Sequence, residues 1–121
     1  MLFRFREFPV YKKAKEFRRL VKNLLKKFPS SERFLLIDQI DRAVNSICLN
    51  IAEGSNRNTG KDKAHFLNLS LTSLEEVIAG FDLAIDDHYI TQGDMNIILQ
   101  TGEELGKQLI GFARSLIRSN S

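Results

Sequence analysis

The residue types that most often perform chemistry in proteins are few and scattered in this sequence. Its two histidines, His65 and His88, each lack the glutamate three residues earlier that a di-iron site in a helical bundle requires. Asp62 and His65 could hold a metal at one end of a helix, but two ligands are too few for a protein metal site. Cys48 is flanked by apolar residues on both sides, so we interpret it as a buried, unreactive thiol.

Phosphate-binding and nucleophile motifs are also missing from the sequence. It contains no GxxxxGK[ST], no GxGxxG and no GxSxG pattern. Gly54 and Gly60 bracket a polar loop, and Arg57 within it and Lys61 just after it could contact a phosphate, but a plain helix–helix connection is the simpler interpretation. We therefore expect a protein that is not an enzyme and that uses no metal and no cofactor.

The composition predicts one folded, cytoplasmic domain over residues 1–121. A hydrophobic content of 43% is ordinary for a globular protein, and a single cysteine excludes an internal disulfide framework. The longest apolar run, residues 34–37, is far shorter than the roughly 20 residues that span a bilayer. Since the first residues hold no signal-peptide core either, we expect no membrane partner.

Proline, glycine and capping residues divide the chain into four segments, which we predict to be helices at approximately residues 9–28, 31–53, 61–88 and 93–118. Pro29 stops the first segment, and Gly54 suits a left-handed position that ends the second. Thr91 and Asp94 resemble a capping box before the fourth. The connections are short, so neighbouring helices should run antiparallel.

Within each segment the apolar residues recur at intervals of three and four, which places one stripe on one helix face. The stripes are Val10, Ala14, Phe17, Val21, Leu24, Phe28; Ile37, Ile40, Val44, Ile47, Ile51; Leu67, Leu71, Leu74, Ile78, Phe81, Ile85, His88; and Ile98, Gly102, Leu105, Leu109, Phe112, Leu116. Helices with such stripes pack at about 20°. The sequence therefore predicts an all-α protein, an antiparallel up-and-down four-helix bundle.

Some apolar residues fall outside these stripes and indicate self-association. On the helical projection they lie on or beside the outer sides of the second and third helices, and they are Phe34, Leu35, Leu49, Leu69 and Leu83. The fourth helix also contains three glycines, each of which costs about 1 kcal/mol relative to alanine unless another helix approaches closely. These are Gly102, Gly106 and Gly111. We predict a homo-oligomer whose interface includes the five apolar residues.

One pattern in the sequence indicates a ligand, and it consists of basic residues. Residues 1–28 contain ten of the eighteen Lys and Arg residues against only two glutamates, so this part carries +8 and the remainder −5. Opposite the apolar stripe of the first helix stand Lys12, Lys15, Arg19, Lys22 and Lys26, and Arg18 flanks them. They extend over about 21 Å at 1.5 Å per residue. A cationic ridge of that length could follow several backbone phosphates of RNA or DNA, independently of base sequence.

Two simpler interpretations of the basic ridge stay open. Lysines on an outer face keep a bundle soluble, and the ridge could also pair with the acidic third and fourth helices of a neighbouring subunit. The carboxylates of those helices are Glu75, Glu76, Asp82, Asp86, Asp87, Asp94, Glu103 and Glu104. The leading hypothesis is a non-catalytic, oligomeric nucleic-acid-binding protein. The alternative is a structural or protein-interaction module whose charges serve solubility or subunit pairing.

Residues 39–54, QIDRAVNSICLNIAEG, resemble the pattern Q-[IL]-R-R-A-x-x-S-I-x-x-N-I-A-E-G of the four-helix bundle proteins encoded in bacterial 23S rRNA intervening sequences. Residues 3–14 and 66–76 agree with the same family. The resemblance implies an up-and-down bundle that assembles as a ring, commonly a pentamer. It also implies a function that is undetermined, with RNA or DNA binding suspected.

One position departs from the family pattern. The family's paired arginines are Asp41 and Arg42 here, so a pair that served a polyanion would have lost one cation and gained a repulsive charge. We interpret the signature residues Asn50, Glu53 and Gly54 as structural, with Gly54 ending the helix and the other two fixing the following loop through hydrogen bonds.

Overall fold

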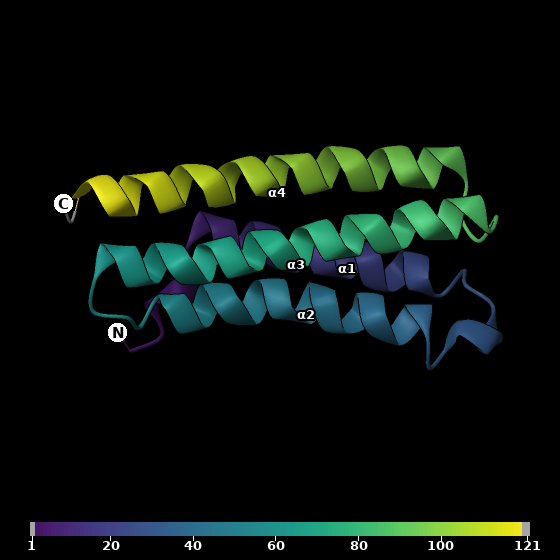
Figure 1. Cartoon of the computed structure of the whole chain (residues 1–121), viewed down its shortest axis with the longest axis horizontal. Helices are drawn as coiled ribbons and strands as arrows, with labels where there is room; N and C mark the ends of the chain where they lie inside the picture. The colour runs from purple at the N-terminus through teal and green to yellow at the C-terminus, as the bar shows by residue number, and fades with distance from the viewer. Residues whose placement is uncertain (1, 120–121) are drawn as a thin grey trace.

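The computed structural model describes residues 2–119, which form four α-helices (Figure 1). They are α1 (Pro9–Leu25), α2 (Leu36–Gly54), α3 (Gly60–Asp86) and α4 (Gln92–Ser119). Two 3₁₀ turns accompany them, η1 (Arg4–Glu7) before α1 and η2 (Ser30–Glu32) between α1 and α2. No strand occurs between residues 2 and 119, so the all-α prediction is confirmed. No helix in this range is long and apolar enough to cross a bilayer.

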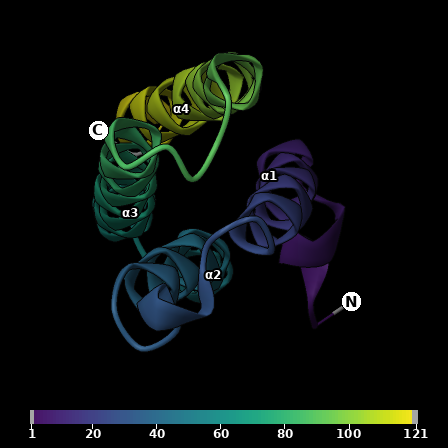
Figure 2. The same ribbon diagram turned by 90° about the vertical axis from the view of Figure 1, so that its right-hand side faces the viewer.

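The helices stand at the corners of a four-sided bundle (Figure 2). α1 packs against α2 and α4, and α3 packs against the same two helices, whereas the backbones of the diagonal pairs stay further apart. Consecutive helices run in opposite directions along the long axis (Figure 1). The predicted antiparallel up-and-down topology is therefore confirmed.

The first two helices are shorter than predicted. α1 ends at Leu25, and the chain continues as a turn in which the Phe28 amide donates to the Leu25 carbonyl (3.1 Å). Phe28 is nonetheless buried, with its ring edge-on to Phe81 at 5.9 Å between centroids. α2 begins only at Leu36, because residues 30–32 form the turn η2 instead of a first α-helical turn.

The predicted apolar stripes correspond largely to the core, and the largest difference is on α3. All six stripe residues of the first predicted helix are buried, including Phe28 just after α1. On α3, by contrast, Leu71, Ile78 and Ile85 are only partly buried, while Ser70, Val77, Gly80 and Ala84 are fully buried. The reason is that α3 packs more extensively against α2 and α4 than α1 does, so its buried face is wider than a single heptad stripe.

His88 and Gly54 exchange the roles that the sequence assigned to them. His88 is exposed rather than in the core, and it adopts the left-handed conformation with φ of 63°. Its amide donates to the Ile85 carbonyl, and the Tyr89 amide donates to the Ala84 carbonyl (2.9 Å), which closes α3 with a Schellman motif. No glycine between residues 2 and 119 has a positive φ, so the left-handed prediction for Gly54 was wrong.

The start of α4 follows the sequence prediction. The Thr91 hydroxyl accepts a hydrogen bond from the Asp94 amide (3.0 Å), and the Asp94 carboxylate accepts one from the Thr91 amide (3.1 Å). These two reciprocal bonds form the predicted capping box.

Candidate nucleic-acid interface

The six cations predicted on the outer face of α1 divide into two groups in the structure. Lys12, Lys15, Arg19 and Lys26 are exposed, and we call these four the outer ridge. Arg18 and Lys22 are half-buried because they lie at the flank of α1 that faces α2.

The two half-buried cations are engaged by α2. The Arg18 Nε donates to Asn45 Oδ1 at 2.8 Å, and Lys22 forms an ion pair with Asp41. Asp41 is the residue that replaces an arginine of the family pattern. It therefore neutralises one of the six cations, so the charge available at this face is smaller than the sequence count.

The positive charge of the outer ridge is hardly neutralised by carboxylates of the same chain. Lys12 pairs with Glu7 at 3.1 Å, but both side chains are more than half exposed, and ion pairs of this kind contribute little. Lys26 donates only to the neutral amide of Asn23 (3.4 Å). Among residues 2–119, no carboxylate lies within 4.0 Å of the charged nitrogens of Lys15, Arg19 or Lys26.

The opposite flank of α1 and the turn that follows it are tied to α4 by two ion pairs. Lys13 Nζ lies 2.9 Å from Glu104, and the hydrogen bond to that carboxylate raises the pKa of Lys13. Lys27 Nζ lies 2.9 Å from Asp94 Oδ2, and its hydrogen bond lowers the pKa of Asp94. The cations on both flanks thus hold α1 against its neighbours, whereas the cations of the outer ridge have no ion pair with α2 or α4.

The aromatic surroundings of the outer ridge favour phosphate contacts over base stacking. Tyr11 is the aromatic residue nearest the ridge, and the Lys15 ammonium already lies over its ring, 5.6 Å from the centroid. The edge of the same ring is packed against Phe5 at 5.0 Å. A base would have to displace one of these contacts before it could stack.

Among the signature residues, Glu53 bonds to Arg57 of the following loop as predicted, whereas Asn50 has a different partner. The Asn50 side chain donates to the carbonyl (2.9 Å) and hydroxyl (3.0 Å) of Ser46, one turn earlier in α2. Ser73 of α3 donates to the same hydroxyl at 3.0 Å, and the fully buried Ser70 donates to the Ile47 carbonyl at 2.9 Å. Asn50 therefore orders a polar seam between α2 and α3 and does not contact the loop.

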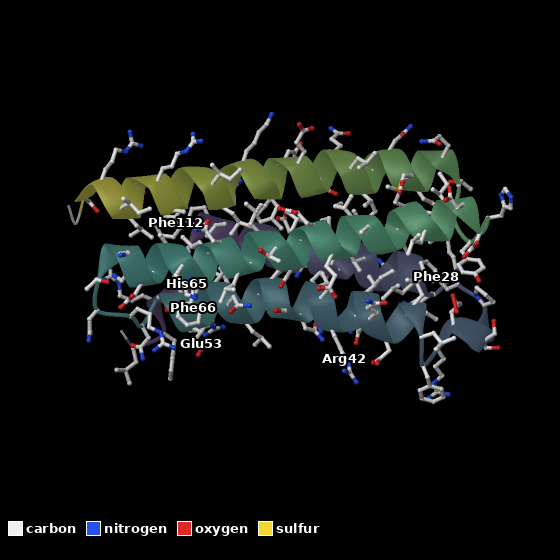
Figure 3. The ribbon with its side chains drawn as sticks, in the orientation of Figure 1. Phe28, Arg42, Glu53, His65, Phe66 and Phe112 are labelled. Carbon is white, nitrogen blue, oxygen red and sulfur yellow. The ribbon has the colours of Figure 1, made fainter. Side chains whose placement is uncertain are left out.

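Glu53 lies near Phe66 of α3 (Figure 3), and Gly54 follows it as the last residue of α2. A Cβ on Gly54 would lie 2.6 Å from the Cβ of Phe66, so the glycine is required by close helix packing. Glu53 accepts from Arg57 at 3.0 Å, and the Arg57 guanidinium lies over the Phe66 ring, 4.4 Å from its centroid. Of the two cations that could have met a phosphate, Arg57 is therefore already engaged, whereas Lys61 is exposed.

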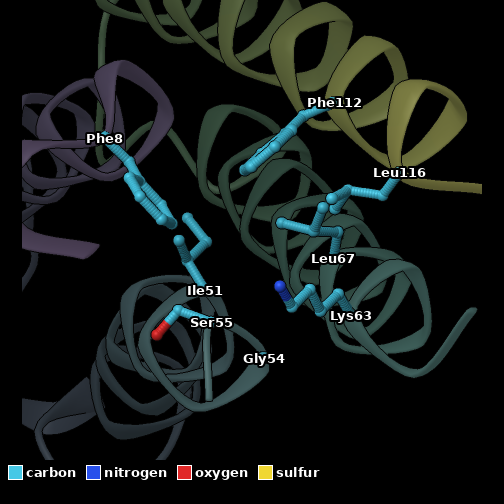
Figure 4. Close-up of a pocket in the computed structure, with 8 residues that line it drawn as sticks. All are labelled: Phe8, Ile51, Gly54, Ser55, Lys63, Leu67, Phe112 and Leu116. Carbon is cyan, nitrogen blue, oxygen red and sulfur yellow. The ribbon is translucent and has the colours of Figure 1, made fainter. Parts of the chain in front are cut away.

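A small cavity lies at this end of the bundle (Figure 4). It measures about 50 Å³, and all four helices or their caps contribute residues: Phe8, Ile51, Gly54, Ser55, Lys63, Leu67, Phe112 and Leu116. Its walls are mostly apolar, and the one charged group there is the Lys63 amine. A space of this size suits a water molecule rather than a substrate.

The other residues whose side chains could perform chemistry do not lie together. Cys48 is buried, and burial raises the pKa of its thiol. The exposed His65 ring lies edge-on to Phe66 at 5.6 Å between centroids. Within residues 2–119, no three His, Cys, Asp or Glu side chains come together as metal ligands would.

The five residues predicted for an oligomer interface are all exposed, but they fall into two groups. Exposure ranges from 80% for Phe34 to 38% for Leu69. Leu49 and Leu69 lie toward one end of the α2–α3 pair, while Phe34, Leu35 and Leu83 lie toward the other. At Gly102 the close approach comes from within the chain, since a Cβ there would meet Ile78 of α3 at 3.0 Å, whereas a Cβ on Gly111 would have nothing within 4 Å.

Sequence reasoning missed two further exposed apolar groups. Leu2 and Phe3 precede α1, with exposed fractions of 91% and 61%. Leu99, Ile110 and Ile117 form a second apolar stripe on α4. The signal for the α4 stripe was present, because residues 11 and 7 apart lie on one side of a helix.

Comparison with known proteins identifies the family. The chain matches the family described as 23S rRNA-intervening sequence protein over residues 6–111. It is also similar to a crystal structure of a protein with unknown function from the S23 ribosomal protein family of Bacteroides thetaiotaomicron VPI-5482. The two sequences are 30% identical, with a TM-score of 0.78 over 86% of this chain and 97% of the other. The search of curated proteins gave no match. The chain therefore belongs to the 23S rRNA-intervening sequence protein family.

Proposed function

We propose that this protein is a non-catalytic, homo-oligomeric bundle that binds RNA or DNA through the outer ridge of α1. The observation that carries the proposal is the state of Lys15, Arg19 and Lys26. These side chains are exposed along one side of α1 and its C-terminal cap, and no carboxylate of residues 2–119 lies within 4.0 Å of them.

Such a surface recognises phosphate rather than base. Lysine ammonium groups are strongly hydrated point charges without directional preference, and the nearby Tyr11 ring is already in contact with Lys15 and Phe5. Binding through about three phosphates should weaken with salt, because each contact releases condensed counterions. The expected slope of log affinity against log salt is about −2 to −3.

The sharpest test reverses the charge of the outer ridge. The variant Lys15→Glu/Arg19→Glu/Lys26→Glu should lose binding to fluorescein-labelled RNA or duplex DNA, measured by fluorescence anisotropy across a salt series. The matched control Arg33→Glu/Lys61→Glu/Arg114→Glu reverses three exposed cations outside α1 and should retain most of the affinity and the salt slope. Equal losses in the two variants would show that net charge, not the ridge, controls binding.

A second variant should strengthen binding. Asp41→Asn removes the carboxylate that pairs with Lys22, which adds one cation at the edge of the ridge. We expect the affinity for nucleic acid to rise and the salt slope to steepen by about one contact. An unchanged or weaker affinity in Asp41→Asn would contradict a phosphate-binding role for this side of α1.

One alternative function has an observation in its favour. Glu75, Glu76, Asp82 and Glu103 are exposed on α3 and α4, so a structural or protein-interaction module could use the ridge only for solubility or for pairing with these carboxylates. That function predicts no nucleic-acid binding by the native protein at about 100 mM salt, and a native mass that falls when the ridge is reversed.

A further inference from the structure

The face formed by α3 and α4 carries a groove of about 890 Å³. Its floor is apolar, with Leu74 and Ile78 from α3 and the side-chain-free positions Gly102 and Gly106 from α4. Leu99 and Ile110 flank it and remain 44% and 38% exposed. Two glycines one helical turn apart deepen the space between the helices, and large apolar side chains are left in contact with solvent beside it.

The rim of this groove is acidic. Glu75, Asp82 and Glu103 line it, against the single cation Lys107. None of the three carboxylates has a Lys, Arg or His nitrogen within 4.0 Å among residues 2–119. The groove therefore combines uncovered apolar surface with uncompensated negative charge, which fits an apolar segment that carries cations.

The N-terminal segment has the complementary chemistry. Leu2 and Phe3 are 91% and 61% exposed and share a hollow with Leu49 of α2, which is 66% exposed. Arg4 and Arg6 follow Phe3 in the chain, and both are exposed and without an ion pair among residues 2–119. We call these five residues the N-terminal patch.

The backbone of η1 holds this patch in place. The Arg6 amide donates to the Phe3 carbonyl at 3.1 Å, and Phe5 anchors the segment by its edge-on contact with Tyr11 of α1. The N-terminal segment lies beside α1 and α2, on the other side of the bundle from the α3–α4 face (Figure 2). The patch therefore cannot reach the groove of its own chain.

We propose that the N-terminal patch of one copy docks into the α3–α4 groove of a second copy. The proposal rests on the self-association included in the proposed function, and it names the two surfaces that make the contact. Leu2 and Phe3 enter the apolar groove, and Arg4 and Arg6 meet its acidic rim. Because patch and groove are different surfaces, the contact is head-to-tail, and repetition gives a ring or an open chain rather than a two-fold dimer.

This arrangement leaves the nucleic-acid surface free. Lys15, Arg19 and Lys26 line neither the hollow beside the patch nor the groove. A head-to-tail assembly would therefore carry several outer ridges at once, which raises the avidity for a long polyanion without any new contact.

Charge reversal tests the pairing. Native mass is measured by size-exclusion chromatography with light scattering for three variants. Arg4→Glu/Arg6→Glu reverses the patch, Glu75→Lys/Glu103→Lys reverses the groove, and a third variant carries all four changes. We expect the native protein to be an oligomer and each two-site variant to dissociate, with at least a tenfold weaker association. The four-site variant should regain the native mass, and an equimolar mixture of the two-site variants should associate again, with the two variants alternating along the assembly.

Controls separate pairing from unfolding and from bulk charge. Lys61→Glu/Arg114→Glu and Glu76→Lys/Asp86→Lys make the same charge changes at exposed positions outside both surfaces and should keep the native mass. Phe3→Ser should weaken association in the same way as the reversed patch. Circular dichroism should show an unchanged helix content in every variant, since all of these positions are exposed.

The outcomes distinguish this inference from the proposed function. An oligomer whose mass is unaffected by either reversal, or one that the four-site variant fails to restore, overturns the pairing and leaves nucleic-acid binding untouched. A native protein that is monomeric at about 100 µM overturns it too, and anisotropy on the same sample then decides nucleic-acid binding separately.

Discussion

Replacement of glycine by alanine should have opposite effects on stability at Gly80 in α3 and at Gly111 in α4. Gly80 is buried, and a Cβ there would lie 2.5 Å from Ile40 Cγ1 and 2.8 Å from its Cδ1. Gly111 is exposed, and a Cβ there would have nothing within 4 Å. Both stand inside helices, so the gain in helix propensity from Gly→Ala is the same at the two sites, about 1 kcal/mol.

The surroundings of each glycine determine how much the substitution changes the free energy of unfolding. Gly111→Ala has only the propensity term and should stabilise the protein by about 1 kcal/mol, equivalent to a melting temperature about 4 °C higher. At Gly80 the new methyl overlaps an atom attached directly to the Cβ of Ile40, a side chain that is 1% exposed and cannot move aside. Overpacking of this kind costs about 1–3 kcal/mol, and we take the upper value, so Gly80→Ala should destabilise by about 2 kcal/mol net.

Urea unfolding at one fixed protein concentration measures both effects, because self-association would otherwise shift the midpoints. The double variant Gly80→Ala/Ile40→Ala provides the control. Removing Cγ1 and Cδ1 relieves the overlap, so Gly80→Ala should be neutral or stabilising in the Ile40→Ala background. Equal shifts for the two glycine variants, or no coupling to Ile40, would refute the close approach of α2 and α3 at this point.

Three further outcomes are expected. Burial raises the pKa of the Cys48 thiol, so a maleimide should label it at least tenfold faster in urea than in buffer at one pH. The Lys27 hydrogen bond lowers the pKa of Asp94 below its usual value of 3.8. The ionised Asp94 therefore stabilises the fold above pH 3.8, and this stabilisation is lost as the pH falls through the lowered pKa. Asp94→Asn should flatten the acid side of the plot of unfolding free energy against pH. Ser70→Ala removes a buried bond to the Ile47 carbonyl and should lower the free energy of unfolding by about 1 kcal/mol in urea titrations.

Much of the fold could be predicted because the decisive signals are local. A run of residues at intervals of three and four dictates one buried face, and every predicted stripe residue of α1 is indeed buried. The capping box at Thr91 and Asp94 is likewise a property of four consecutive residues, and it forms as predicted.

The turn at the end of α3 shows where local signals were insufficient. His88 continued the apolar spacing of α3, and Gly54 is the residue type that most often ends a helix in the left-handed conformation. The structure reverses these roles, because the space available to Gly54 is set by Phe66 across the α2–α3 contact. Neither spacing nor propensity contains that distance.

The candidate nucleic-acid interface was likewise predictable only in part from the sequence. The sequence by itself determined that the cations of α1 lie opposite its core stripe, since helix periodicity alone gives that direction. Only the tertiary structure decided which cations are available, because Lys22 and Arg18 are engaged by Asp41 and Asn45 of another helix. It also decided that α3 and α4 leave an apolar groove between them. Partners and grooves depend on how each helix is rotated against its neighbours, and that rotation is a property of the whole bundle rather than of any one segment.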